Sequence, residues 1–290
     1  MTHSFRGSDG TRLSLHVDPG PRGGATFLFV NGLACPSLYW GPLLDAFRGH
    51  ATLVTFDLKG HGRSDAARTS DGATIEGCAH DAALALDEAG TDRAVVFGFS
   101  MGCQVALELW RRRRERVAGY VLALGAFERP FATMLHGRLG ALPKTLLDRT
   151  PAAAASLALK FGSCTLGFAL GHKLAQRGSM VGLTTSHAQM APFYKHLGEL
   201  DPATWLGLAR SASEHSAAEL LPTIDAPTLV VTGRHDLFTP PAVGRTMAES
   251  IPGAELLEVS NATHTGLLDA PQPIVGATAR FLARRGLAGA

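Results

Sequence analysis

The strongest constraint on the fold of this chain is the alternation of short apolar runs with segments of helical periodicity in its first half. The apolar runs are bounded by Gly, Asn or Asp, as buried strands are. The predicted strands are 25–30, 51–56, 93–99 and 119–124, and the predicted helices between them are 38–47, 74–89 and 101–117. Because a helix between two strands carries the chain back across one face of a sheet, this pattern predicts an α/β fold with a mostly parallel central sheet flanked by helices.

Two further patterns extend the predicted sheet at both ends. Turn-forming residues at 8–11 (SDGT) lie between two extended segments, so we expect an antiparallel hairpin at its start. Late in the chain, two more strands are predicted at 228–231 and 255–259. The helices predicted with them are 242–250 and 273–285.

The segment 128–217 interrupts this pattern, because its apolar residues recur at helical spacing and no strand is predicted in it. The simplest interpretation is an α/β core formed by 1–127 and 218–290, with a helical cap inserted at 128–217. The apolar stretch 151–170 lies within this insertion and carries Lys160 near its middle, which opposes insertion into a membrane. We therefore expect one or two cap helices there and no stable membrane insertion.

Composition and charge exclude several classes of protein. Hydrophobic residues make up 46% of the 290-residue chain and charged residues 18%, which excludes wholesale disorder. The 27 Lys and Arg residues nearly balance the 25 Asp and Glu residues, so we expect no nucleic-acid partner. The four cysteines lie far apart, so no disulfide framework is predicted. Residues 1–10 do not resemble a secretory leader, and we expect a soluble, cytoplasmic protein, whose oligomeric state the sequence does not indicate.

One serine occupies the position that a nucleophile needs in such a sheet. The run 98–102 (GFSMG) follows the predicted strand that ends at Phe99 and opens the helix that starts at Met101. Ser100 therefore falls in a strained strand-to-helix turn that exposes its hydroxyl, and the flanking glycines leave room for that turn. The pattern alone is short enough to arise by chance, so the inference depends on its position between strand and helix.

A carboxylate and an imidazole follow the last two predicted strands. A serine hydroxyl reacts only when a neighbouring base removes its proton, and an acid must orient that base. Asp236 follows the strand at 228–231, and His264 follows the strand at 255–259. Because sites in open α/β sheets gather at the carboxyl ends of strands, we expect both side chains to face Ser100. The order Ser, Asp, His along the chain also matches the order known for this type of fold.

Together with three further runs, these residues resemble the α/β-hydrolase superfamily. The further runs are 30–33 (VNGL), 57–64 (DLKGHGRS) and 264–271 (HTGLLDAP). The resemblance covers the sheet portions of the chain and implies that Ser100 is the nucleophile, His264 the general base and Asp236 the orienting acid. It also implies that the backbone N–H groups of Leu33 and Met101 form the oxyanion hole. No cofactor and no metal are expected.

Other polar residues need separate interpretation. Glu128 follows the strand at 119–124, where some relatives carry the acid, so it is an alternative to Asp236. Asn31 stands where many relatives have His, and we expect this difference to change only hydrogen bonds within its loop. We expect structural roles for a larger group, namely Asp57, His61, Arg63, His235, Cys35, Cys103 and the arginine run 111–114. The histidines of the insertion share no metal-ligand spacing; they are His136, His172, His187, His196 and His215.

These features predict a serine hydrolase that cleaves a small or medium carboxylic ester, or a thioester or lactone, through an acyl-enzyme. The same triad would also serve carbon–carbon bond hydrolysis or peroxide-dependent perhydrolysis, and a third alternative is a ligand-sensing signalling protein on the same fold. The insertion carries nine Lys or Arg and five acidic residues, an excess that would attract an anionic substrate. Its many apolar residues favour a small-molecule substrate with an apolar part.

Overall fold

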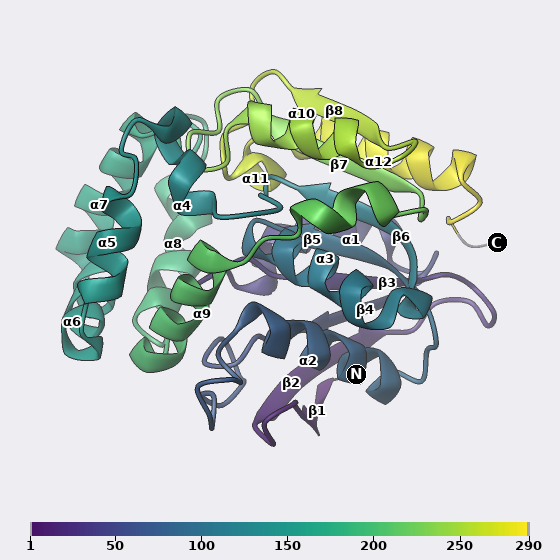
Figure 1. Ribbon diagram of the computed structural model, residues 1–290, viewed down its shortest axis with the longest axis horizontal. Helices are drawn as coiled ribbons and strands as arrows, with labels where there is room; N and C mark the ends of the chain where they lie inside the picture. Colours follow the sequence, from purple (N-terminus) through teal and green to yellow (C-terminus); the bar gives the residue numbers. More distant parts are fainter. Residues whose placement is uncertain (1, 289–290) are drawn as a thin grey trace.

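Eight strands form one sheet in the computed structural model, which describes residues 2–288 (Figure 1). The strands are β1 (Thr2–Arg6), β2 (Arg12–Asp18), β3 (Thr26–Val30), β4 (Thr52–Phe56), β5 (Ala94–Phe99), β6 (Val117–Ala123), β7 (Thr228–Gly233) and β8 (Glu255–Val259). Their spatial order is β1-β2-β4-β3-β5-β6-β7-β8. β2 pairs antiparallel with both β1 and β4, and the remaining neighbours pair parallel. The predicted hairpin and the mostly parallel sheet are therefore confirmed.

Helices cover both faces of the sheet, which explains why the central strands are apolar along their whole length. In β3, Phe27 and Phe29 pack into one apolar cluster, whereas Leu28 and Val30 pack into the other, because alternate side chains of a strand point to opposite faces. The helices are α1 (Gly41–Phe47), α2 (Ile75–Glu88), α3 (Met101–Arg113), α10 (Pro241–Ser250) and α12 (Pro271–Arg284). α2, α3 and α10 pack against the Leu28 face, and α1 and α12 pack against the Phe27 face.

The chain between β6 and β7 forms a group of helices at one end of the molecule, on the left in Figure 1. They are α4 (Pro130–Thr133), α5 (Leu142–Arg149), α6 (Ala152–Ser163), α7 (Thr165–Arg177), α8 (His187–Leu197) and α9 (Pro202–Glu214). The two ends of this helical segment lie side by side, because Arg129 N donates to His215 O at 3.1 Å and Ala217 N donates to Phe127 O at 3.0 Å. The division into a core and a cap at 128–217 stays a prediction.

The observed elements differ from the predicted ones mainly in short helical turns. The predicted helix at 38–47 begins as a 3-10 turn, and two short elements were not predicted, the 3-10 turn Ala218–Thr223 and α11 (Gly266–Asp269). The apolar stretch 151–170 divides at Cys164 between α6 and α7. Over residues 2–288, no single helix is long and apolar enough to cross a membrane; α6 and α7 together have that length and composition, but they are bent by 89°.

A fully buried ion pair anchors the loop that follows β4. Both side chains are 0% exposed, and Lys59 Nζ lies 2.6 Å from Asp81 Oδ2. Lys59 also donates to Ser8 Oγ at 2.9 Å, and Asp81 accepts a hydrogen bond from Ser8 N at 2.7 Å. The pair therefore connects three parts of the chain: the turn between β1 and β2, the loop after β4, and α2.

We predict that Lys59→Met lowers the free energy of unfolding by about 3–5 kcal/mol, because Asp81 then remains buried without its cation. Unfolding in urea, followed by circular dichroism, measures this change. The double variant Lys59→Met/Asp81→Leu is the matched control and should be more stable than Lys59→Met alone, because the uncompensated charge is gone. An unchanged urea midpoint in Lys59→Met would show that the ion pair does not stabilise the fold.

Candidate active site

Ser100 lies in the turn between β5 and α3 with a backbone conformation that few residues adopt. Its φ is 54° and its ψ is −120°, a combination that is costly for any residue except glycine. A Cβ atom at Gly98 would lie 2.7 Å from the Gly102 carbonyl oxygen, and one at Gly102 would lie 2.2 Å from the Val30 carbonyl oxygen. The close backbone packing therefore requires glycine on both sides, as predicted for this turn.

His264 contacts both Ser100 and Asp236, although 164 positions separate it from Ser100 along the chain. His264 Nε2 lies 3.0 Å from Ser100 Oγ, and His264 Nδ1 lies 2.9 Å from Asp236 Oδ2. The residues follow β5, β7 and β8, so all three lie at the carboxyl edge of the sheet. When Nδ1–H donates to the carboxylate, Nε2 is left free to accept the serine proton. This arrangement can therefore support nucleophilic catalysis.

Asp236 is 0% exposed, and its orientation is set by donors from Phe238 and Thr239. Its Oδ1 accepts hydrogen bonds from Phe238 N at 2.8 Å and Thr239 N at 2.9 Å. Thr239 Oγ1 lies 2.7 Å from Asp236 Oδ2 and 3.0 Å from Leu124 O. These donors compensate for the burial of a charge and hold the carboxylate toward His264. Thr239 was not expected from the sequence, although Asp followed by a hydroxyl residue three positions later is a turn signal.

Two backbone N–H groups beside Ser100 are free to bind a substrate oxygen. Within the described part of the chain, neither Leu33 N nor Met101 N donates a hydrogen bond. Leu33 lies in the loop after β3, and the adjacent Gly32 packs so closely that a Cβ atom there would lie 2.9 Å from Ser100 Cβ. Met101 opens α3, and the first N–H groups of a helix have no partner within it. The role of these two groups as an oxyanion hole stays a prediction.

His61 holds the loop that carries Leu33. Its Nε2 accepts a hydrogen bond from Ala34 N at 2.9 Å, and its Nδ1–H donates to Lys59 O at 2.8 Å. Burial lowers the pKa of His61 to about 4, so the ring stays neutral near pH 7 and keeps the lone pair that Ala34 N–H requires. A structural role for His61 was expected from the sequence, whereas this contact with the candidate oxyanion loop was not.

Asp269 connects the loop of His264 to the helical segment. Its Oδ1 accepts hydrogen bonds from Thr265 Oγ1 at 2.8 Å and from Gly182 N at 3.3 Å, and it also accepts one from Thr185 Oγ1. Its Oδ2 accepts a hydrogen bond from Thr263 N at 3.2 Å. Asp269 belongs to the run 264–271 that marked the histidine loop, but spacing alone did not indicate which segment it would contact.

An apolar cavity of about 350 Å³ lies against Ser100 and His264, between the carboxyl edge of the sheet and the helical segment. The described residues that line it include no Lys, Arg, Asp or Glu. Most of its wall is aromatic or aliphatic; the lining includes Tyr39, Phe99, Met190, Phe193, Tyr194 and Trp205. The cavity can therefore accept an uncharged, apolar group next to the serine oxygen.

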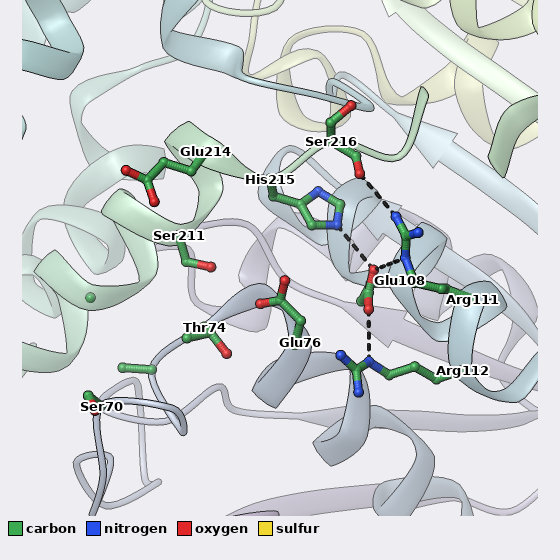
Figure 2. Close-up of a pocket in the computed structure, with 12 residues that line it drawn as sticks. Ser70, Thr74, Glu76, Glu108, Arg111, Arg112, Ser211, Glu214, His215 and Ser216 are labelled. Carbon is green, nitrogen blue, oxygen red and sulfur yellow. Dashed lines mark hydrogen bonds and ion pairs between the residues drawn. The ribbon is translucent and has the colours of Figure 1, made fainter. Parts of the chain in front are cut away.

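A second cavity, of about 670 Å³, lies between α2, α3 and α9, and none of the three candidate catalytic residues lines it. Figure 2 shows Glu108 at its wall, paired with Arg111 Nε and Arg112 Nε at 2.8 Å and with His215 Nε2 at 3.3 Å. Burial alone would raise the pKa of Glu108, but the hydrogen bonds from His215, Arg111 and Arg112 lower it to about 2. Glu108, Arg111, Arg112 and His215 thus pair with one another and connect α3 to the end of α9.

The geometry supports Asp236 rather than Glu128 as the partner of His264. Glu128 Oε2 accepts a hydrogen bond from Ser216 Oγ at 2.9 Å and so helps to join the two ends of the helical segment. Asn31 accepts a hydrogen bond from Trp40 Nε1 at 2.8 Å and donates to Ser37 Oγ at 3.3 Å. Asn31 thus forms hydrogen bonds beside its loop, and the expectation that it differs from the family's His only in such bonds stays a prediction.

Several other polar residues named from the sequence lie where structural roles are expected. His235 and the arginines at 111–114 are exposed, and Asp57 Oδ2 accepts a hydrogen bond from Arg63 N at 3.0 Å. Cys35 and Cys103 are buried and free, and burial raises the pKa of the Cys35 thiol to about 12. Across the described chain, no group of three or more His, Cys, Asp or Glu side chains is placed to hold a metal ion.

The comparisons with known proteins agree with this geometry. Residues 25–271 match the family described as alpha/beta hydrolase fold. The chain is 24% identical to 3-oxoadipate enol-lactonase 1 of Acinetobacter baylyi over 266 residues, which are 92% of this chain and 91% of that protein. The chain therefore belongs to the α/β-hydrolase-fold family, and it is a hydrolase enzyme.

Two solved structures have the same fold over nearly their full length. The esterase RhEst1 from Rhodococcus sp. ECU1013 has a TM-score of 0.76 and 21% identity, with 97% of this chain and 98% of that chain covered. The enol-lactonase from Burkholderia xenovorans LB400 has a TM-score of 0.71 and 23% identity, with 97% of this chain and 100% of that chain covered. At this level of identity, both similarities establish the fold and leave the substrate open.

We predict that His61 makes the fold less stable as the pH is lowered. The unfolded chain binds a proton at His61 near pH 6.5, the ordinary value, whereas the folded chain binds it only near pH 4. The contribution of His61 is therefore complete above about pH 6.5, and about 3 kcal/mol of it is lost by about pH 4. Urea unfolding across this pH range measures the loss.

The variant His61→Gln removes the titrating ring, so its free energy of unfolding should fall less over the same pH range. His50 is exposed, and His50→Gln is a matched control that should keep the pH dependence of the unmodified protein. Identical pH dependence in His61→Gln and the unmodified protein would contradict the assignment.

Proposed function

We propose that this hydrolase cleaves an uncharged carboxylic ester or lactone through an acyl-enzyme on Ser100. The observation that carries the proposal is the contact of 3.0 Å between His264 Nε2 and Ser100 Oγ, at the wall of an apolar cavity. The family supports hydrolysis, and the similarity to an enol-lactonase and an esterase supports an ester or lactone as the bond that is cleaved.

In the proposed first step, His264 Nε2 takes the proton of Ser100 while Ser100 Oγ attacks the carbonyl carbon of the substrate. The carbonyl oxygen becomes an oxyanion, and the N–H groups of Leu33 and Met101 stabilise it by about 2.7–4 kcal/mol per donor. Asp236 stabilises the imidazolium that forms. The carbon–oxygen bond then breaks, and His264 passes its proton to the leaving oxygen, which leaves an ester of Ser100.

In the proposed second step, water replaces the alcohol. His264 takes one proton from the water, whose oxygen attacks the acyl carbon, and a second oxyanion forms in the same place. When the bond to Ser100 breaks, His264 returns the proton to Ser100 Oγ. The carboxylic acid leaves, and the starting state of the enzyme is restored without any external group.

The surroundings of the cavity favour a substrate without a free carboxylate in the part that enters it. The described residues of its wall carry no cationic side chain to pair with an anion. Two carboxylates contact residues of the wall: the buried Asp236 pairs with His264, and the partly buried Asp269 accepts hydrogen bonds from Thr265 Oγ1 and from backbone N–H groups. An anionic acyl chain would therefore be desolvated beside negative charge. We infer that the basic excess of the helical segment does not serve to bind an anionic substrate in this cavity.

We predict that Ser100→Ala folds normally and lowers kcat for p-nitrophenyl hexanoate by about 10⁴-fold or more, because no other nucleophile replaces the hydroxyl. Release of nitrophenolate measures the rate. Ser70→Ala is the matched control: Ser70 lines the second cavity, and its replacement should leave the rate unchanged. Turnover in Ser100→Ala close to that of the unmodified protein would refute the proposed mechanism.

We predict that kcat/KM for p-nitrophenyl hexanoate exceeds that for the p-nitrophenyl monoester of adipic acid by about 100-fold or more. The two acyl chains have the same length and differ by a terminal carboxylate, whose burial without a partner costs several kcal/mol, about tenfold for each 1.4 kcal/mol. Steady-state kinetics with both esters measures the ratio. Equal values would contradict the inferred preference for uncharged substrates without affecting the assignment of Ser100.

A further inference from the structure

The large apolar side chains that are exposed are concentrated in the helical segment. Among the described residues, Leu256 is the only large apolar side chain exposed outside it. Leu157 and Leu166 are 72% and 71% exposed, values unusual for leucine in a folded protein. We call one set of these the outer helical surface, formed by Leu139, Leu142, Leu146, Leu157, Phe161, Leu166, Leu170 and Leu174.

These side chains recur at the spacing that places them on one face of each helix. In α6, Leu157 and Phe161 are four residues apart, while Ala155 and Leu159 point inward and are buried. In α7, the exposed leucines at 166, 170 and 174 form a stripe of the same spacing. Each helix therefore has an inner side that packs and an outer apolar side. α5, α6 and α7 lie together at the end of the molecule farthest from α12 (Figure 1).

The charge of the same stretch is strongly one-sided. Residues 138–177 contain six Lys or Arg and a single acid, Asp148. Lys144 pairs with Asp148 and with Glu214. The other five cations are exposed and form no ion pair with any residue in the described part of the chain; they are Arg138, Arg149, Lys160, Lys173 and Arg177. Exposed leucines and unpaired cations thus occur on the same three helices and the loops beside them.

We propose that the outer helical surface docks on an anionic phospholipid surface. Its leucines would lie at the level where the acyl chains begin, and the five unpaired cations on the same helices and loops would contact the lipid headgroups. Exposed apolar patches mark interaction sites, and helices with an apolar side and flanking Lys or Arg lie in membrane interfaces, where the long basic side chains extend to the headgroups. A second copy of this chain is a poorer partner, because two surfaces of the same positive charge would face each other.

The docking would also bring lipid close to the candidate active site. Helix α7 would separate the lipid from the cavity at Ser100. Gly171 and Ala175 on its inner side line that cavity, whereas Leu170 and Leu174 lie on its outer side. The cavity would then lie about one helix diameter, roughly 10 Å, from the lipid. A water-insoluble ester could reach the cavity from the lipid phase, and this consequence, unlike the docking itself, rests on the proposed function.

The test is co-flotation of the full-length protein with lipid vesicles. One set of vesicles contains equal amounts of phosphatidylcholine and phosphatidylglycerol, and the other contains phosphatidylcholine alone. We expect binding to the first set that weakens as salt is added, and much weaker binding to the second. Absence of binding to the anionic vesicles at low salt would overturn the proposal.

Two pairs of variants separate the apolar from the charged contribution. Leu170→Gln/Leu174→Gln should weaken binding about tenfold or more, whereas Leu256→Gln, the matched control outside the surface, should not change it. Lys160→Gln/Lys173→Gln/Arg177→Gln should weaken binding about fivefold for each charge removed. Its control is a variant with three exposed arginines elsewhere replaced by Gln, at positions 22, 114 and 280; it should weaken binding far less.

Three outcomes would overturn the proposal. The first is equal loss of binding in the surface variants and their controls, which would indicate attraction by net charge alone. The second is concentration-dependent dimerisation without lipid, seen by analytical ultracentrifugation and abolished by Leu170→Gln/Leu174→Gln, which would assign the surface to a second copy. The third is unchanged binding in both surface variants. If the leucine variant fails to fold, as judged by circular dichroism, the lysine and arginine variant still tests whether this surface binds the vesicles.

Discussion

The backbone turn at Ser100 is the constraint on which the rest of the candidate site depends. A residue with a side chain is held there at positive φ, and the cost of that conformation must be met by packing around it. Gly98 and Gly102 allow β5, α3 and the end of β3 to approach within backbone contact. The turn therefore presents the serine oxygen outward at the carboxyl edge of the sheet, where the loops after β7 and β8 can reach it.

Buried polar residues hold the loops around Ser100 in position. The ion pair of Lys59 and Asp81 anchors the loop after β4, and His61 in the same loop binds Ala34 N in the candidate oxyanion loop. The donors around Asp236 act in a similar way on the other side of Ser100. Each of these groups would be costly to bury alone, so their mutual satisfaction connects the stability of the fold to the geometry of the site.

Much of this arrangement could be predicted from the sequence because it is local or follows from simple topology. The strands appear as apolar runs, since both faces of a parallel sheet are buried, and the serine turn appears as a glycine-flanked motif between a strand and a helix. Asp236 and His264 could be expected near Ser100 because parallel strands end at one edge, and their side chains do meet there, whereas their catalytic roles stay predictions. Thr239 and Asp269 were not assigned roles, since their partners depend on how loops distant in sequence pack together.

The amino-acid order alone settles the alternation of strands and helices, the direction of the sheet and the three side chains that meet at its edge. Those features depend on periodicity and on chain direction, which are encoded within short stretches. The shape and neutrality of the cavity, the pairing of Glu108 with His215 and the exposure of the leucines on α5, α6 and α7 depend on packing between distant segments. Helical spacing shows which residues share a side of a helix, but only the folded chain shows which side is covered.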